Sequence, residues 1–235
     1  MIYNKHLYVK RIEEVAQKLD YLLDEVVFVG GAVVALYADD PAASEVRPTD
    51  DIDIVVGIST RAGFSTFEEK LRELGFKNDI ESKFIGRYKI NGIVVDFMPI
   101  EENVLGFSNR WYKTGIEESF LYQIDSDISI RLMPFHYFIA SKIEAHNSRN
   151  KADLRTSKDF EDIVYSFDNR LDPLKDMQEA KGDVAAYLKI QLDDFMESPN
   201  FDEGVYCHLT PASASSRFRR IKGIWSAFTL NVTDG

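Results

Sequence analysis

The hydrophobic pattern of the chain changes once, between residues 125 and 134, and this change limits the fold more than any other feature. Before it, short runs of alternating or β-branched apolar residues are separated by turn residues, as is typical of strands. After it, apolar residues recur at steps of three and four, which predicts helices from Pro134 onward and over 157–167, 184–196 and 213–228. We therefore expect an α/β (α+β) domain with a small mixed sheet over residues 1–125, and a mainly helical domain over residues 126–235.

Composition and charge exclude several classes of function. The 235 residues are 45% hydrophobic and 29% charged, which is typical of a globular chain with a sizeable core and excludes disorder. The formal net charge of −11 excludes a surface that is basic throughout, so a polyanion would have to meet a local basic patch. The best candidate for that patch is also typical of a solvated helix face, and it consists of Arg217, Arg219, Arg220 and Lys222.

Cysteine usage and hydropathy bear on the compartment. Cys207 is the single cysteine, so no intramolecular disulfide can form, and no apolar run approaches the roughly 18 residues of a spanning helix. The opening residues also lack the charged and apolar regions of a signal peptide. We expect a cytoplasmic protein with no membrane contact.

A glycine pair interrupts the first strand-like segment. An amphipathic helix is predicted over 5–23, a short strand over 26–29, and a helix over 32–37 after Gly30 and Gly31. A diglycine lets the backbone approach a ligand closely, and the amide groups that begin a following helix favour a phosphate. A tight connection between strand and helix explains the pair equally well, so both interpretations stay open.

Three carboxylates stand at unusual positions in this pattern. Asp51 and Asp53 share one face of a strand predicted over 51–56. The dipeptide Asn91-Gly92 predicts a hairpin between 84–90 and 93–98, which puts Asp96 near the far end of a strand. Between these segments, a helix is expected over 65–74, with a capping box at its start and a glycine at its end.

The three carboxylates favour a metal ion. Like charges at close range repel and lose hydration inside a sheet, so the arrangement is costly without a cation. A hard divalent ion such as Mg²⁺, with two ions expected and Mn²⁺ as a substitute, takes oxygen ligands and holds phosphate oxygens as well. This chemistry is phosphoryl or nucleotidyl transfer. The alternatives are a solvated strand edge for Asp51 and Asp53, and a hydrogen bond to a turn for Asp96.

The motifs together resemble a known superfamily. Phe28-Val29-Gly30-Gly31, Arg47-Pro48-Thr49-Asp50-Asp51-Ile52-Asp53 and Val95-Asp96-Phe97 are similar to the DNA polymerase β nucleotidyltransferase superfamily. Within it, residues 140–145 and 157–163 resemble the abortive-infection E type, the nucleotidyltransferase toxins of type IV toxin-antitoxin systems. The resemblance covers residues 26–167 and leaves residues 170–235 without an assigned role. The 19 residues between Gly31 and Asp51 exceed the usual gap of the superfamily.

The resemblance implies a role for each matching residue. Asp51 and Asp53 would ligate the metal, and Asp96 would ligate it or activate the acceptor hydroxyl. Lys142 would contact the nucleotide phosphates, and Asp159 matches an acid that the toxin relatives need for activity. Its alternative role is to complement the start of a helix. The nucleotide-binding set that the resemblance implies is Gly30, Gly31, Thr49 and Lys142.

These observations predict a magnesium-dependent enzyme that transfers NMP from an NTP to an acceptor hydroxyl and releases pyrophosphate. The toxin resemblance favours the 3′ end of tRNA, or another RNA, as the acceptor and implies a cognate antitoxin. An antibiotic nucleotidyltransferase acting on an aminoglycoside or lincosamide is the alternative enzyme. A non-catalytic, antitoxin-like binding protein on the same fold is the alternative of a different class.

Overall fold

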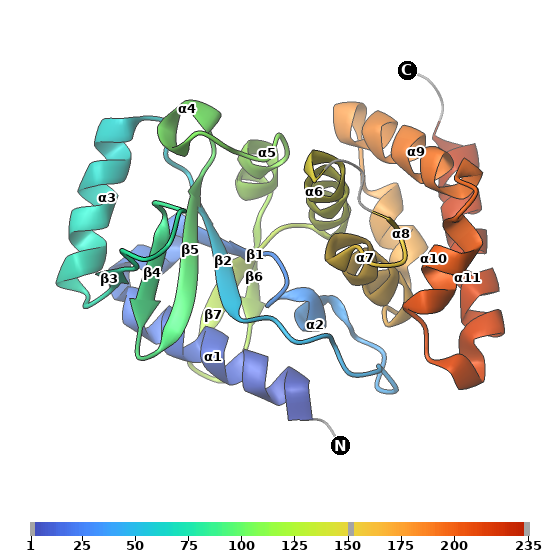
Figure 1. Ribbon diagram of the computed structural model, residues 1–235, viewed down its shortest axis with the longest axis horizontal. Helices are drawn as coiled ribbons and strands as arrows, with labels where there is room; N and C mark the ends of the chain where they lie inside the picture. The colour runs from blue at the N-terminus through green and yellow to red at the C-terminus, as the bar shows by residue number, and fades with distance from the viewer. Residues whose placement is uncertain (1–2, 150–152, 233–235) are drawn as a thin grey trace. The chain divides into compact units, whose positions relative to one another are not determined.

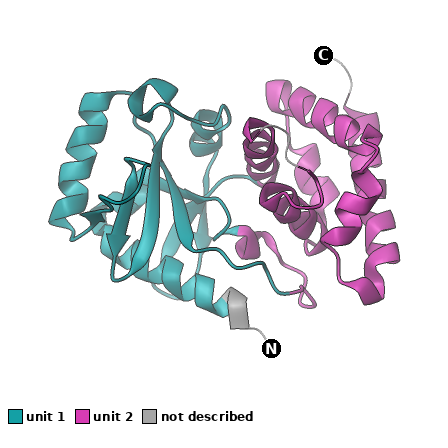
Figure 2. Cartoon of the chain, viewed as in Figure 1, with its two compact units in different colours: residues 1–33, 45–134 teal, residues 34–44, 135–235 magenta. Residues whose placement is uncertain are grey.

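The computed structural model describes residues 3–149 and 153–232, which divide into two compact units (Figure 2). Unit 1 comprises residues 1–33 and 45–134, and unit 2 comprises residues 34–44 and 135–235. The sequence analysis places the division at residues 125 and 126. The segment 34–44, which is expected in the first domain, belongs to unit 2. The strand over 129–132, which is expected in the second domain, belongs to unit 1.

Unit 1 contains a mixed sheet, as expected. In the described part of the chain its seven strands follow the order β3-β4-β5-β2-β1-β7-β6. Strand β2 runs parallel to β5, and β1 runs parallel to β7, whereas the other neighbours are antiparallel. The strands are β1 (Val26–Val29), β2 (Asp51–Val56), β3 (Lys77–Asn78), β4 (Arg87–Ile90), β5 (Ile93–Pro99), β6 (Phe120–Gln123) and β7 (Ser129–Leu132).

The hairpin of β4 and β5 forms at the predicted dipeptide. Asn91 and Gly92 both have positive φ angles, +49° and +82°, which are the backbone angles that a two-residue hairpin turn requires. The pairing across this turn joins Ile90 to Ile93 and, three residues further along each strand, Arg87 to Asp96. Strand β4 begins at residue 87 rather than 84, and Asp96 is the fourth of the seven residues of β5 rather than near its end.

The helices of unit 1 differ in part from the prediction. They are α1 (Tyr3–Leu19), the 3₁₀ helix η1 (Asp20–Glu25), α3 (Arg61–Glu73), α4 (Glu102–Leu105) and α5 (Tyr112–Glu117). Helix α3 begins at 61, not at 65, because the Thr60 hydroxyl caps it by accepting a hydrogen bond from the Gly63 amide. Its end agrees with the prediction, since Gly75 follows with a φ of +92°.

The described residues of unit 2 form helices and their connections, with no strand. Its helices are α2 (Val34–Tyr37), α6 (Phe135–Ser148), α7 (Lys158–Asp168), α8 (Pro173–Gln178), α9 (Gly182–Glu197), α10 (Phe201–Cys207), the 3₁₀ helix η2 (Pro211–Ser213) and α11 (Ala214–Asn231). The segment 34–44 packs within this unit, because Tyr37 stacks on Phe138 and the Tyr165 hydroxyl donates to the Ser44 carbonyl. None of the helices in the described residues is long and apolar enough to cross a bilayer.

Candidate active site on the sheet of unit 1

The three predicted carboxylates lie on neighbouring strands of unit 1. In the register of β2 and β5, Asp53 lies directly opposite Asp96, and in that of β4 and β5, Asp96 lies opposite Arg87. Figure 1 shows these three strands side by side. Directly paired residues share one face of a sheet, and Asp51, two residues before Asp53, shares it too. We call Asp51, Asp53 and Asp96 the carboxylate cluster.

Arg87 neutralises part of this cluster. Its Nε and Nη2 atoms donate to the two carboxylate oxygens of Asp96, each at 2.7 Å, and Nη2 also donates to Asp51 Oδ2 at 3.0 Å. A two-point guanidinium–carboxylate contact is among the strongest ion pairs that proteins form. The sequence analysis expects the carboxylates to need a metal because they repel, but the chain supplies one cation of its own.

The charges of this pair respond to burial and to each other. The hydrogen bond to Asp96 raises the pKa of the Arg87 guanidinium further above its ordinary value, so Arg87 stays charged. Burial raises the pKa of the Asp96 carboxyl, although Arg87 acts on it in the opposite direction.

The glycine turn lies directly against Asp53. Gly30 has a φ of +72°, and a Cβ atom added to it would stand 1.8 Å from Asp53 Oδ2. The absence of a side chain at residue 30 is therefore what leaves room for the Asp53 carboxylate. This contact joins two residues, Gly30 and Asp53, that are more than 20 positions apart in the sequence.

The segment before β2 completes the surroundings of the turn. A Cβ atom on Gly31 would lie 2.9 Å from Arg47 Nη2 and 3.2 Å from Thr49 Oγ1, so both side chains border the turn. The Thr49 hydroxyl donates to Asp51 Oδ1 at 3.2 Å, and the Arg11 guanidinium of α1 donates to the Thr49 carbonyl at 3.0 Å. Arg47 belongs to the motif 47–53, but no role for it is predicted from the sequence.

The helix after the glycine pair is shorter than expected. Helix α2 spans four residues, Val34–Tyr37, rather than 32–37, and it belongs to unit 2. One turn of helix has too few aligned peptide groups to provide the dipole that the prediction invokes for a phosphate. Any phosphate contact at this point therefore depends on the amides of the turn and on neighbouring cations such as Arg47.

The carboxylate cluster fits a divalent ion in its chemistry but is bound to the protein's own groups. Its three carboxylates are the oxygen donors that Mg²⁺ or Mn²⁺ takes. Within residues 3–149 and 153–232, however, no three acidic, histidine or cysteine side chains converge so that they could hold an ion as they stand. The reason is local, because Asp53 packs at Gly30 while Asp51 and Asp96 both accept hydrogen bonds from Arg87.

The predicted residues of unit 2 form a buried ion cluster within that unit. Lys142 Nζ lies 2.6 Å from Asp162 Oδ2 and 3.5 Å from Asp159 Oδ1, and Arg149 also pairs with Asp159. The side chains of Lys142, Asp159 and Asp162 are at most 7% exposed. The Ser157 hydroxyl caps helix α7, and Asp159 lies in the first turn of this helix. A role for Lys142 and Asp159 with a nucleotide stays a prediction.

The basic cluster near the C-terminus is largely engaged within unit 2. Arg217 pairs with Asp168, and Lys222 lies 3.5 Å from Asp202. The Arg220 guanidinium donates to the carbonyls of Phe167, Asp168, Arg170 and Leu171, where α7 ends. These contacts favour a structural role for the cluster over a surface for RNA phosphates.

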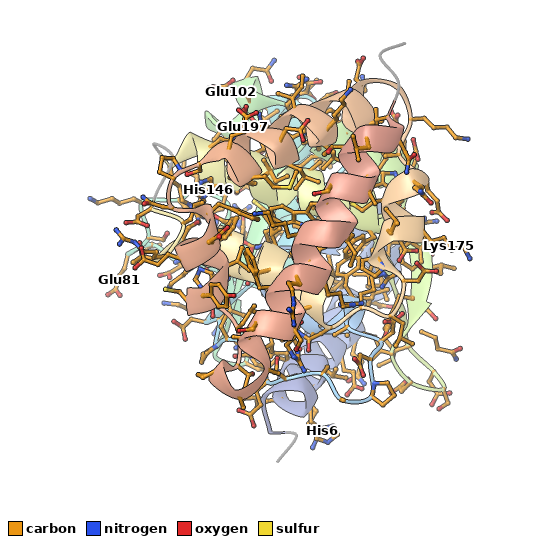
Figure 3. The ribbon with its side chains drawn as sticks, turned by 90° about the vertical axis from the view of Figure 1, so that its right-hand side faces the viewer. His6, Glu81, Glu102, His146, Lys175 and Glu197 are labelled. Carbon is orange, nitrogen blue, oxygen red and sulfur yellow. The ribbon has the colours of Figure 1, made fainter. Side chains whose placement is uncertain are left out.

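Unit 2 also contains a cavity that the sequence analysis does not foresee. Its volume is about 260 Å³, and His146, which lines it, is labelled in Figure 3. The residues that line it include His146, Asn147, Gln191, Asp194, Phe195 and Asn200. None of the predicted site residues is among them.

Two solved structures share features of this fold. One is the solution structure of the antibiotic-resistance factor ANT(2″)-Ia, with a TM-score of 0.46, 13% identity, and coverage of 69% of this chain and 83% of that one. The other is the crystal structure of a candidate nucleotidyltransferase from H. pylori, with a TM-score of 0.46, 11% identity, and coverage of 94% and 95%. No protein-family model and no curated protein matches the sequence. Similarity at this level does not assign an activity to this chain.

Proposed function

We propose that the chain is a divalent-metal-dependent nucleotidyltransferase that transfers NMP from an NTP to an acceptor hydroxyl. The observation that carries the proposal is the register that sets Asp53 opposite Asp96, with Asp51 on the same strand face and Gly30 against Asp53. A strand pair that gathers three carboxylates beside a glycine turn matches the pattern for which the resemblance predicts nucleotidyl transfer.

The residues of the cluster would divide the work. Asp51, Asp53 and Asp96 would hold Mg²⁺ or Mn²⁺, which, when bound, would neutralise phosphate charge and orient the triphosphate for in-line attack. In the alternative arrangement, Asp96 would accept the proton of the acceptor hydroxyl rather than ligate the metal. Thr49 would orient Asp51 through its hydrogen bond, and the turn at Gly30 and Gly31 would accommodate the phosphates.

The acceptor is the finer part of the proposal. The toxin resemblance favours the 3′ end of tRNA, with a cognate antitoxin as partner. A cationic small molecule such as an aminoglycoside is the second candidate, because the chain carries a net charge of −11 and its best basic cluster is engaged in internal contacts. A binding protein without catalysis is a third possibility, since Arg87 relieves part of the repulsion that otherwise argues for a metal.

A labelling experiment tests the reaction and separates the acceptors. The protein is incubated with Mg²⁺ or Mn²⁺ and each α-³²P-labelled NTP in turn, with total tRNA or with a panel of aminoglycosides and lincosamides. Label on tRNA supports the first acceptor, and label on a drug supports the second. Label on neither, with both metals and all four nucleotides, contradicts the proposal.

A matched pair of variants ties the reaction to the cluster. Asp53→Asn should lower the transfer rate at least about a hundredfold, because it removes a charged metal ligand. Asp50→Asn makes the same chemical change at an exposed residue just before β2 and should leave the rate within about twofold of the wild type.

A further inference from the structure

Arg87 occupies the carboxylates that the proposed metal would need. Both carboxylate oxygens of Asp96 and one of Asp51 accept hydrogen bonds from a single guanidinium, whose side chain is 31% exposed. The Asp96 side chain is only 10% exposed, so few water molecules can compete with Arg87 for its carboxylate oxygens. A contact that is charged, two-pointed and partly buried is stable in the absence of ligand.

A divalent ion cannot join these oxygens while Arg87 remains. Oxygen ligands lie about 2.0–2.1 Å from Mg²⁺. An ion on Asp51 and Asp96 would thus stand within a few ångströms of the guanidinium, and positive charges at that separation repel strongly in a partly buried site. The metal and Arg87 are competitors for the same two carboxylates.

The Arg87 side chain can also adopt a second position, outside the carboxylate cluster. In the described part of the chain its Nη1 atom has no hydrogen-bond partner, and the side chain is exposed enough to turn outward. A guanidinium matches the geometry of phosphate oxygens, and an NTP brings such oxygens to this face of the sheet.

We propose that Arg87 is an internal counter-ion that a divalent metal displaces from Asp51 and Asp96, and that the displaced side chain binds the nucleotide phosphates. This inference rests on the proposed function, because it requires the cluster to bind a metal. It adds that the cluster without ligand is closed by the chain's own cation. The metal affinity of the cluster therefore depends on the hydrogen bonds that Arg87 loses as well as on the carboxylates.

The direct test measures metal binding rather than activity. Mn²⁺ serves as the probe, because the electron paramagnetic resonance signal of the free aqua ion disappears when the ion binds. Arg87→Gln should bind Mn²⁺ about tenfold more tightly than the wild type, or better, since two charge-assisted contacts no longer compete. Arg87→Lys keeps the charge without the fork and should bind with intermediate affinity.

Two further variants control the test. Lys89→Gln removes one positive charge two residues along β4, where Lys89 pairs with Asp79 instead of the cluster. It should change Mn²⁺ affinity less than about twofold, which separates displacement from a general charge effect. Asp53→Asn should weaken Mn²⁺ binding in every background, which places the bound ion at the cluster.

Thermal unfolding gives a second readout that does not depend on catalysis. Without metal, Arg87→Gln should unfold at a lower temperature than the wild type, because Asp51 and Asp96 are left without their cation. Saturating Mg²⁺ should raise its Tm by more than it raises that of the wild type. An equal rise in both proteins contradicts the inference.

The outcomes distinguish the inference from the proposed function. If the wild type binds Mn²⁺ through Asp53 but Arg87→Gln binds it no more tightly, Arg87 does not compete and the inference is overturned while the proposed function stands. If no variant binds Mn²⁺ at millimolar concentration, both are overturned. If Lys89→Gln tightens binding as much as Arg87→Gln, the effect is one of net charge, and the displacement is refuted.

Discussion

Gly30→Ala is the substitution whose cost the structure defines most closely. The new methyl group would stand 1.8 Å from Asp53 Oδ2, 2.6 Å from Cγ and 2.7 Å from Cβ of the same residue. Real Cβ atoms do not approach other atoms this closely, so Asp53 or the turn must move. The backbone also has a φ of +72° at residue 30, which an alanine adopts only with strain.

The two contributions to the cost have separate magnitudes. The left-handed conformation costs a residue with a side chain about 1–2 kcal/mol. Forcing a methyl group into the space of a packed side chain costs about 1–3 kcal/mol more. Gly30→Ala should therefore lower the free energy of unfolding by about 2–5 kcal/mol and, by displacing Asp53, weaken Mn²⁺ binding as well.

Two other glycines measure these contributions independently. Gly92 has a φ of +82° and an added Cβ there would meet no atom within 4 Å, so Gly92→Ala reports the backbone strain alone. The φ of Gly31 is not in the left-handed region, and its added Cβ would meet mainly the ends of Arg47 and Thr49, so Gly31→Ala reports a milder collision. Urea unfolding of the three variants gives the free energies. If Gly30→Ala is no less stable than Gly92→Ala, the close contact with Asp53 does not exist.

Three further predictions concern unit 2. Burial raises the pKa of Tyr165 to about 12 from an ordinary value of 10.0. The contribution of the protonated hydroxyl to the free energy of unfolding is therefore complete below pH 10 and is lost as the pH rises to 12. Tyr165→Phe should flatten the fall in stability over that range, measured by urea unfolding. Lys142→Met should destabilise the protein by about 3–5 kcal/mol, and adding Asp162→Leu should restore most of the loss, because it removes the buried carboxylate whose ion pair with Lys142 was broken. Arg220→Met should lower the free energy of unfolding by about 1–3 kcal/mol, whereas Arg219→Met, at an exposed residue of the same helix, should change it by less than about 0.5 kcal/mol.

Local signals in the sequence predict much of the fold. The apolar run of β1, the alternation of β2 and the Asn91-Gly92 turn each specify an element without reference to distant residues. The same holds for the long helices of unit 2, whose periodicity reflects one buried face. These elements are confirmed to within a few residues at their ends.

The elements that the sequence analysis misses lack such signals. Strand β6 is mostly exposed and does not alternate, so its pairing with β7 rather than its own pattern makes it a strand. Strand β3 has two residues, and helices α4 and α5 have four and six. Elements this short depend on their neighbours for stability, and no window of sequence contains that information.

In the candidate site, single residues show the same difference between pairings that local sequence predicts and pairings that it does not. The pairing of Arg87 with Asp96 follows from the hairpin alone, because a two-residue turn at Asn91 and Gly92 fixes which residues of the two strands face each other. Counting outward from that turn identifies Arg87 as the partner of Asp96 from the sequence alone. The pairing of Asp53 with Asp96 is different in kind. It requires β2 and β5 to be parallel neighbours more than 35 residues apart, and parallel pairing leaves no local trace.

The pairing of Arg87 with Asp51 and Asp96 changes the electrostatics of the site. Three carboxylates alone carry a charge of −3 and would bind a divalent ion to escape their mutual repulsion. With Arg87 in contact the cluster carries −3 + 1 = −2, and two of its members already have a hydrogen-bonded cation. The repulsion therefore does not by itself require a metal. The difference in Mn²⁺ affinity between the wild type and Arg87→Gln measures how strongly Arg87 competes with the ion for the cluster. A wild type whose Mn²⁺ affinity equals that of Arg87→Gln would show that the ion pair and the metal do not share a site.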